Sequence, residues 1–576
     1  MPRGFRKVVA AFGAGALMVS SAWAGASLMP VPGEDTVQQA TDVVAPPAQT
    51  SEPSSRTTSP AATPTKRASA PSAASLPAGQ VLAGAAKTSI RPRPADYGGT
   101  WETDPAKCRT LSEDAFSAAM EDPVATGDHL ASTGSPWPEN PNCIYMGGFS
   151  IGPMNPVSSW NDDLGLWVRA IALRDRDGDD LVLVVVDGEG WFWDYAKKCE
   201  DCGSKQLSER LAAESDLGLE AEDVVIAATH AHSSPDFIGG WGFVPDWYMK
   251  QVADTIMSTV RTAVGRMRPA VLEYGERTAR AFNHERRGTY RSAEEQQLAW
   301  LRAYEPAATR GTEPTARKRS RRRRTKSKPP PRPKTIATLG AYAAHPTTFG
   351  TNDGEAHPDW PGLFEKSLEQ RFGGIGLHFM TGLGNMSASG LDHSADDLAG
   401  LVADIGAGNR VDGPDIRTKR STWTQPVTNV PLTALGVPGF FDRQFIDSPS
   451  SVQTGKDGGV HCASSGPTSA EVAASAARIG DELALSASPG EIFSNASNTL
   501  KEQSKAPVTF PLGQANDALG YMPQSFELNP VGQQGLGFAV NGFVFVNYED
   551  SYAIDRCFGD MALETSIGLL GELAKP

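Results

Sequence analysis

Apolar runs of strand length and helical patterns follow one another along the chain. Trp167–Leu173 and Leu181–Val186 are apolar runs separated by an Asp-Gly turn, which predicts a β-hairpin. Asp223–Ala228 has the composition of a buried strand. Trp247–Met267 has apolar residues three and four positions apart, which is typical of a helix.

The same pattern continues through the rest of the chain. Gln206–Glu214 is a predicted helix, and Ile336–Ala343 and Leu377–Met380 are predicted strands. Strands that are apolar along their whole length are usually covered on both faces. We therefore expect an α/β fold in which mixed sheets are covered by helices, within a single large catalytic domain.

The N-terminus has the order of features found in secretory signals. Basic residues precede an apolar run from Val8 to Val19, and Ala22 and Ala24 form an A-x-A cleavage pattern. We expect residues 1–24 to be a signal peptide and the protein to be secreted or extracytoplasmic. An uncleaved signal would instead anchor the protein at the cell surface, and the sequence leaves both outcomes open.

Two stretches have the composition of disordered chain. Residues 25–93 are rich in Ala, Pro, Ser and Thr, which predicts a linker before a folded domain at 94–576. Residues 316–334 carry eleven Lys or Arg and lie between two predicted strands, so we expect a disordered basic insertion. Such a loop is either solvated or a peripheral contact for a membrane or an anionic wall polymer.

Composition narrows the class of protein. The chain has 576 residues, of which 40% are hydrophobic, and its formal net charge of −14 argues against a nucleic-acid partner. The six Cys residues are an even number, which is typical of disulfides in an exported protein, but the pairing stays open. Cys199 and Cys202 also have the spacing of half a zinc or redox motif.

Histidines and a Gly-rich loop stand where predicted strands end. One strand leads into His230 and His232, whose spacing would direct both rings to the same side of an extended segment. A second strand ends at His345, and a third is followed by a Gly-rich loop that contains Ser387. These positions are candidates for a metal or acid–base site, although a single buried histidine is more often a hydrogen-bonded core residue.

Five segments around these residues occur in the order of a known family. They are Thr229–Pro235, Ala344–Phe349, His357–Gly362, Gly382–Ser387 and Ser488–Glu491. They resemble, in turn, the T-H-T-H-S-G-P, V-H-P/S-x-S-M, S-P-D-N-x-G, N-x-G-[DN]-[VL]-S and A-P-A-E motifs of the neutral/alkaline, non-lysosomal ceramidases. Members of that family are zinc amidases that cleave the amide bond of N-acylsphingosine.

The resemblance implies a role for each matching residue. It implies Zn2+ as the cofactor with His230, His345, Glu491 and Tyr521 as metal ligands, and Ser387, His232, Tyr548 and Arg287 as catalytic residues. His232 would relay a proton or donate to the oxyanion, with Tyr548 assisting. Ser387 would orient the amide or act as the nucleophile. Arg286 is an equally adjacent candidate for the arginine.

The resemblance implies an exported zinc-dependent amidohydrolase of a ceramide-like lipid. Asp236 and Phe237 stand where the family has glycines, which leaves a hydrolase of another N-acyl or ester substrate open. A surface-binding protein on a degenerate hydrolase frame is the alternative from a different class. We expect no C-terminal β-domain after the catalytic domain.

Aromatic residues gather near the predicted site. They are Trp191, Phe192, Trp193, Phe237, Trp241, Phe243 and Trp247. They would either line a groove for an acyl chain or pack in the core.

Overall fold

The computed structural model describes most of the chain beyond its N-terminal region. The described residues are 73–108, 140–149, 155–196, 198–199, 201–239, 243–288, 293–306, 333–429, 442–455, 459–528 and 548–574. At Tyr548 and Ser551 only the backbone is described. The predicted signal peptide at 1–24 lies outside these residues, as does the predicted basic insertion at 316–334 except for its last two residues.

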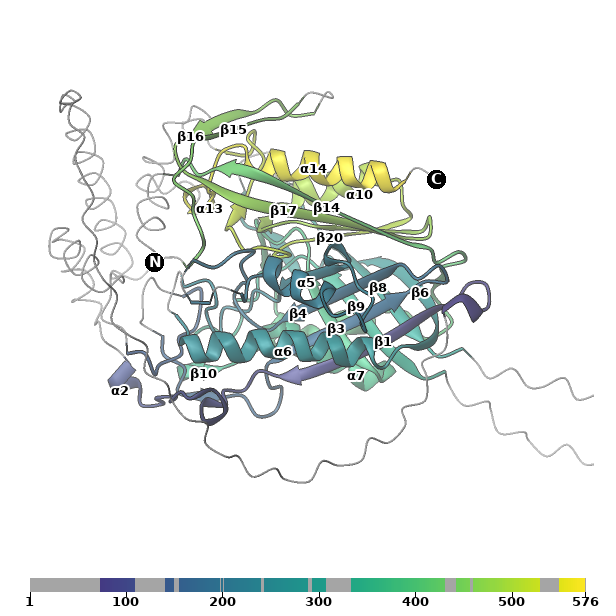
Figure 1. The fold of residues 1–576 in the computed structure, drawn as a ribbon, viewed down its shortest axis with the longest axis horizontal. Coiled ribbons are helices and arrows are strands. Elements are labelled where there is room, and N and C mark those ends of the chain that lie inside the picture. Colours follow the sequence, from purple (N-terminus) through teal and green to yellow (C-terminus); the bar gives the residue numbers. More distant parts are fainter. Residues whose placement is uncertain are drawn as a thin grey trace, which may run out of the picture.

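A large mixed sheet forms the lower half of the molecule in Figure 1. In spatial order its strands are β11 (Ile375–Met380), β9 (Thr335–Tyr342), β8 (Gln297–Tyr304), β6 (Arg268–Thr278), β1 (Val81–Ser89), β3 (Trp167–Arg174), β4 (Asp180–Val186) and β5 (Val224–Ala228), and β13 (Asn409–Arg410) pairs with β6. β11 runs parallel to β9 and β5 runs parallel to β4. The other neighbours are antiparallel.

A smaller sheet packs face to face on the large one. Its strands are β14 (Ile416–Pro426), β17 (Ser469–Ile479), β18 (Leu483–Ala487) and β20 (Val508–Leu512), in that spatial order. The core between the two sheets contains Leu183 and Val185 of β4 together with Leu485 and Phe510 of the smaller sheet. Burial of these side chains joins the two sheets into one body.

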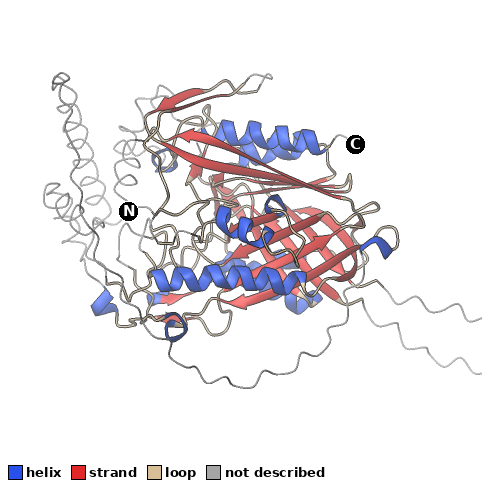
Figure 2. Cartoon of the chain, in the orientation of Figure 1, coloured by secondary structure: helices blue, strands red, loops and turns tan. Residues whose placement is uncertain are grey.

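Helices cover the outer faces of both sheets. α6 (Asp246–Val264) and α7 (Asp359–Phe372) cover the large sheet, α10 (Ser494–Gln503) and α14 (Phe558–Leu573) cover the smaller one, and α5 (Ser204–Ala212) and α8 (Leu391–Gly400) pack beside them. Two short helices, α2 (Pro105–Cys108) and α13 (Tyr548–Ser551), lie outside these layers. The result is a four-layer arrangement of helices, two sheets and helices, visible in Figure 2.

β4 shows why the apolar runs of the sequence are strands. Val182, Val184 and Val186 face the cluster formed with α6, whereas the alternate residues face the smaller sheet. Every residue of β4 is buried. A strand covered on both faces has no polar side, so its sequence is apolar throughout rather than alternating.

The sequence predicts most of these elements correctly. The predicted hairpin is β3 and β4, and the predicted strands at 223–228, 336–343 and 377–380 are β5, β9 and β11. The predicted helices at 206–214 and 247–267 are α5 and α6. The sequence predicts a strand on either side of the basic insertion, and these strands are β8 and β9, which are antiparallel neighbours. The α/β fold with helix-covered mixed sheets is confirmed.

Short strand pairs and turns connect the layers. The pairs are β2 (Ser159–Trp160) with β10 (Glu355–Ala356), β7 (Asn283–Glu285) with β12 (Met386–Ala388), β15 (Ser450–Gln453) with β16 (Ala463–Gly466), and β19 (Glu491–Ile492) with β21 (Tyr521–Met522). Single turns of 3-10 helix lie at Ala73–Ser75, Pro94–Tyr97, Ala221–Asp223 and Asn352–Gly354. The β7–β12 and β19–β21 pairs carry residues of the candidate site.

The predicted linker at 25–93 is wrong over its last part. Val81–Ser89 is β1, which lies between β6 and β3 in the middle of the large sheet. Its small residues resemble linker composition, but packing requires one of them, Gly84. A Cβ atom on Gly84 would overlap the carbonyl oxygen of Ala263 and would lie 2.7 Å from the backbone nitrogen of Met267, where α6 crosses the strand.

Gly84→Ala is expected to destabilise the protein. The added methyl group has no space beneath α6, and overpacking of this kind costs about 1–3 kcal/mol. Thermal unfolding followed by circular dichroism should show a lower midpoint. Gly568→Ala is the matched control, since a Cβ atom at this exposed position of α14 meets nothing within 4 Å and alanine favours helix. Equal midpoints for both variants would contradict the packing argument.

The described cysteines are paired in disulfides, which resolves the pairing that the sequence leaves open. The pairs are Cys108–Cys143, Cys199–Cys202 and Cys462–Cys557. The two cysteines of the C-x-x-C segment therefore form a disulfide with each other. Among the described residues, every helix is too short or too polar to cross a lipid bilayer.

Candidate metal and catalytic site

The predicted histidines and the Gly-rich loop follow strands from the two ends of the large sheet, which approach each other where β11 contacts β5. β5 ends at Ala228, just before His230, and β9 ends at Tyr342, just before His345. The ring centroids of these two histidines are 5.2 Å apart. β11 is followed by the Gly-rich loop, whose Ser387 forms a backbone bridge with His345.

The two histidines after β5 converge through a turn. The expectation of an extended segment is wrong, because His230 adopts a left-handed backbone with a φ of 56°. The turn nevertheless brings His230 Nε2 and His232 Nε2 to 3.2 Å. Together with His345 they form a group whose ligand atoms all lie within 4.8 Å of one another. This histidine group could bind a metal ion.

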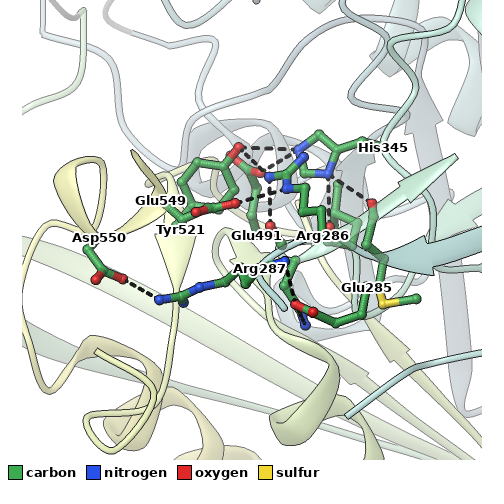
Figure 3. Close-up of polar contacts among 12 residues, drawn as sticks. Glu285, Arg286, Arg287, His345, Glu491, Tyr521, Glu549 and Asp550 are labelled. Atoms are coloured by element: carbon green, nitrogen blue, oxygen red, sulfur yellow. Dashed lines mark hydrogen bonds and ion pairs between the residues drawn. The ribbon is translucent and has the colours of Figure 1, made fainter. Parts of the chain in front are cut away.

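Glu491 and Tyr521 face the same group because they are paired residues of two short parallel strands, β19 and β21. Glu491 Oε2 lies 2.9 Å from His345 Nε2 and 3.5 Å from His230 Nε2. The Tyr521 hydroxyl lies 3.3 Å from His345 Nε2, as Figure 3 shows. The structure therefore brings together all four ligands that the family resemblance implies.

The hydrogen bonds of the two histidines indicate that the group is built to hold a cation. His230 Nδ1 donates to the Glu189 carbonyl at 2.6 Å, and His345 Nδ1 donates to the Leu383 carbonyl at 2.8 Å. In a neutral imidazole this leaves the lone pair on Nε2, which in both rings lies close to Glu491. A buried carboxylate facing two lone pairs is repelled unless a proton or a metal ion lies between them. Imidazole, carboxylate and phenol oxygen fit zinc, which takes nitrogen and oxygen ligands.

The charge of Glu491 dominates the electrostatics of the site. Burial alone would lower the pKa of His230, but the Glu491 carboxylate raises it to about 9. Burial would raise the pKa of Glu491, yet His230 and His345 hold it well below its usual range. Burial and the nearby Arg286 lower the pKa of His345 to about 4. Without a metal ion, Glu491 therefore keeps a proton on His230 at neutral pH.

His232 is held beside the other two rings by a glycine and a phenylalanine. Gly148 has a φ of 76°, and a Cβ atom there would overlap the His232 ring. Phe149 packs edge-on against the same ring, with centroids 5.5 Å apart. Burial and the two other histidines lower the pKa of His232 well below its usual value. His232 is therefore a neutral imidazole at the side of the group.

Asn385 connects the Gly-rich loop to the neighbouring segments, a role that the sequence did not assign. Its side-chain oxygen accepts from the Ser494 backbone N–H at 2.9 Å, and its amide group donates to Ser494 Oγ at 2.8 Å and to Glu285 Oε1 at 3.2 Å. Its carbonyl accepts from the Arg286 backbone N–H at 3.0 Å. Two residues further on, Ser387 lies half-buried in β12, next to His345.

The structure places Arg286, rather than the predicted Arg287, at the site. Arg286 Nη2 donates to the Tyr521 hydroxyl at 3.1 Å. Arg287 instead forms a buried ion pair with Asp550 at 2.9 Å. Neighbouring residues of an extended segment point to opposite sides, so only one of the two arginines can face the ligands. The predicted Tyr548 begins α13, and its side chain lies outside the described part of the chain.

Asp359 supports the loop after His345, and sequence reasoning missed this role as well. The residue is fully buried, with a left-handed φ of 52°. Its carboxylate accepts from Thr348 Oγ1 at 2.7 Å and from the backbone N–H of Phe349 at 3.0 Å. The signal that could have revealed it is its position in the segment that resembles S-P-D-N-x-G.

Most of the predicted mouth aromatics pack in the core. Trp191, Phe192, Trp193 and Phe237 are almost completely buried. Phe243 and Trp247 line a cavity of about 450 Å³, whose lining includes none of the three histidines. Trp241 lies outside the described residues. For Trp191, Phe192, Trp193 and Phe237, the alternative of core packing is therefore correct.

Comparison with solved structures identifies the fold around this site. The chain is similar to the crystal structure of neutral ceramidase from Pseudomonas aeruginosa, with a TM-score of 0.54 and 15% identity over 87% of this chain and 76% of that chain. It is similar to a ceramidase complexed with C2, with a TM-score of 0.54 and 15% identity over 86% of this chain and 75% of that chain. No protein-family model matches the sequence, and no curated protein sequence matches it. The predicted resemblance to neutral ceramidases is confirmed for the fold.

Proposed function

We propose that the protein is a zinc-dependent amidohydrolase that cleaves the amide bond of an N-acylsphingosine-like lipid. The observation that carries the proposal is the buried carboxylate of Glu491, which faces the Nε2 atoms of His345 and His230 at 2.9 and 3.5 Å. Nitrogen and oxygen ligands around zinc suit hydrolysis because they can leave a position for water.

The ligand residues hold and orient the metal in this proposal. A zinc ion at this site would polarise the amide carbonyl and lower the pKa of water. His230 and His345 would bind it through Nε2, because their Nδ1 atoms are held by backbone carbonyls. Glu491 would supply the negative charge and Tyr521 the phenol oxygen.

The other residues act on the substrate. His232 Nε2 lies 3.2 Å from His230 Nε2, so it would be close to a water molecule that attacks the amide. We propose that His232 takes the proton of this water and delivers it to the leaving amine. Arg286 would place positive charge near the oxygen on which negative charge develops. Ser387, beside His345, would hydrogen-bond the amide or act as nucleophile.

The choice of a lipid amide as substrate is supported by the neutral ceramidase fold and by the ordered motifs. A hydrolase of another N-acyl or ester substrate is the second candidate, and Asp236 and Phe237, which stand where the family motif has glycines, favour it. Asp236 Oδ1 caps the backbone N–H groups of Ile238 and Gly239 at 3.0 and 2.9 Å. Phe237 packs against Trp191 with ring centroids 5.3 Å apart. Both side chains are buried, and their bulk, absent from the family motif, would change the shape of the segment that follows His232.

Two further parts of the proposal concern location and partners. The signal-like sequence at 1–24 supports export, and the basic residues at 316–334 support a peripheral contact with a membrane or an anionic wall polymer. A binding protein on a degenerate hydrolase frame is disfavoured, since all four implied ligands are present and adjacent.

The purified full-length protein is expected to contain about one zinc ion per chain and to release fatty acid from a fluorescent ceramide. Removal of the metal with a chelator should abolish the release, and added zinc should restore it. Mass spectrometry of the metal and chromatography of the products measure both outcomes. Full activity of metal-free protein would contradict the proposed metal. Activity on N-acyl amino acids or acyl esters, without activity on ceramide, would contradict only the substrate.

A further inference from the structure

We propose that Glu549 is a positioning residue of this site: it orients Arg286 as a hydrogen-bond donor to Tyr521, and so fixes the side of the metal site that Tyr521 and His345 form. The inference rests on the proposed function and adds to it a residue without a role in the motif comparison.

A chain of polar contacts runs from Glu549 to the histidines, as Figure 3 shows. Glu549 Oε1 accepts a hydrogen bond from Arg286 Nε at 2.9 Å. Arg286 Nη2 donates to the Tyr521 hydroxyl at 3.1 Å and to the Gly384 carbonyl at 2.8 Å. The Tyr521 hydroxyl lies 3.3 Å from His345 Nε2. Glu549 thus binds the guanidinium group at Nε, and Nη2 of the same group contacts the proposed ligand Tyr521.

Burial makes this orientation depend on Glu549. The side chain of Glu549 is 3% exposed and that of Arg286 is 16% exposed, so water replaces the ion pair only poorly. The Arg286 backbone is fixed separately, since its N–H donates to the Asn385 carbonyl at 3.0 Å. The planar guanidinium group makes its hydrogen bonds in a rigid fork, so fixing Nε also fixes the direction of Nη2.

The next two residues form a similar pair that does not contact the ligands. Arg287 Nη2 donates to Asp550 Oδ1 at 2.9 Å and to the Glu527 carbonyl at 3.1 Å. Successive acids of α13 therefore bind successive arginines. Asp550 holds α13 in place through its ion pair with Arg287, whereas Glu549 orients Arg286 toward the metal site. The Arg287–Asp550 pair is therefore a matched control for a purely structural effect.

Glu549→Gln is expected to lower kcat and zinc affinity by about 10- to 100-fold each, the usual cost of losing a residue that supports metal ligands. KM should change by less than about threefold, because Glu549 does not contact the substrate in this proposal. Asp550→Asn should lower the thermal midpoint and leave kcat and zinc affinity within about twofold. Zinc affinity is measured by competition with a fluorescent chelator, which reports independently of turnover.

Arg286→Lys is a second variant that tests the same inference. Lysine keeps the charge but lacks the fork, so it should reproduce the loss in zinc affinity, and combining it with Glu549→Gln should add little. If the Glu549 variant does not fold, normal zinc affinity and kcat in Arg286→Lys would overturn the inference. If the wild-type protein binds zinc and hydrolyses amides, a Glu549→Gln variant equal to it would overturn the inference alone. Wild-type protein that binds no zinc would overturn the inference together with the proposed function.

Discussion

Replacing Glu491 with Gln is expected to release zinc from the site and to lower amide hydrolysis by about 10³-fold or more, a loss of roughly 4 kcal/mol in transition-state stabilisation. The substitution keeps the size of the side chain and removes its charge. Glu491 Oε2 lies 2.9 Å from His345 Nε2 and 3.5 Å from His230 Nε2. A glutamine amide can donate hydrogen bonds to these lone pairs, so the variant should fold without a metal ion.

Two measurements separate metal loss from misfolding. Zinc should raise the thermal midpoint of the wild-type protein, since a ligand at 100 times its Kd stabilises by about 2.7 kcal/mol, and should leave that of the Glu491→Gln variant unchanged. Glu295→Gln is the control, because Glu295 is equally buried but is bound by Ser497 and Lys501. It should lose stability and retain zinc. Zinc bound at wild-type stoichiometry by the Glu491 variant would remove Glu491 from the ligand set.

The positions of the histidines could be predicted from local sequence because their signal is local. An apolar run that stops at a polar residue marks the end of a buried strand. His230 and His345 both fit this pattern. The left-handed turn at His230 could not be predicted, because it depends on the Glu189 carbonyl that accepts its Nδ1–H.

The choice between Arg286 and Arg287 depends on contacts that are distant in sequence. In β7, Glu285 pairs with Met386, and the Asn385 carbonyl binds the Arg286 backbone. This register, formed with a segment about a hundred residues away, decides which arginine faces Tyr521. Neither residue type nor spacing carries that information, because both candidates are arginine.

The sequence predicts a linker where the structure has β1, and the reason is again a contact that is distant in sequence. A strand beneath a closely packed helix needs small residues, and Ala and Gly are also the residues of linkers. Gly84 contacts the end of α6, which is far away in the sequence. The prediction failed because the partner that makes small residues necessary was not visible in the local sequence.

Replacing His232 with Gln is expected to lower kcat by about 10²–10³-fold while zinc stays bound, in the range found for general acid–base residues. The ring is neutral, because burial and the other two histidines lower its pKa. Its Nε2 atom lies 3.2 Å from His230 Nε2, close enough to reach a water molecule at the metal site. Glutamine preserves a polar side chain beside Gly148 but cannot take up a proton at neutral pH.

The zinc content of the His232 variant decides which role this residue has. The three histidines lie close enough together for His232 to be a third ligand, whereas the proposed mechanism needs it as a proton carrier. Loss of zinc together with activity would make it a ligand, and full activity would exclude both roles. His378→Gln is the control for removing a buried imidazole. The His378 ring packs against Trp360, with ring centroids 4.5 Å apart, and is not one of the clustered histidines. It should lower the thermal midpoint and leave kcat within about twofold, because the lost ring packs against the core and not against the substrate.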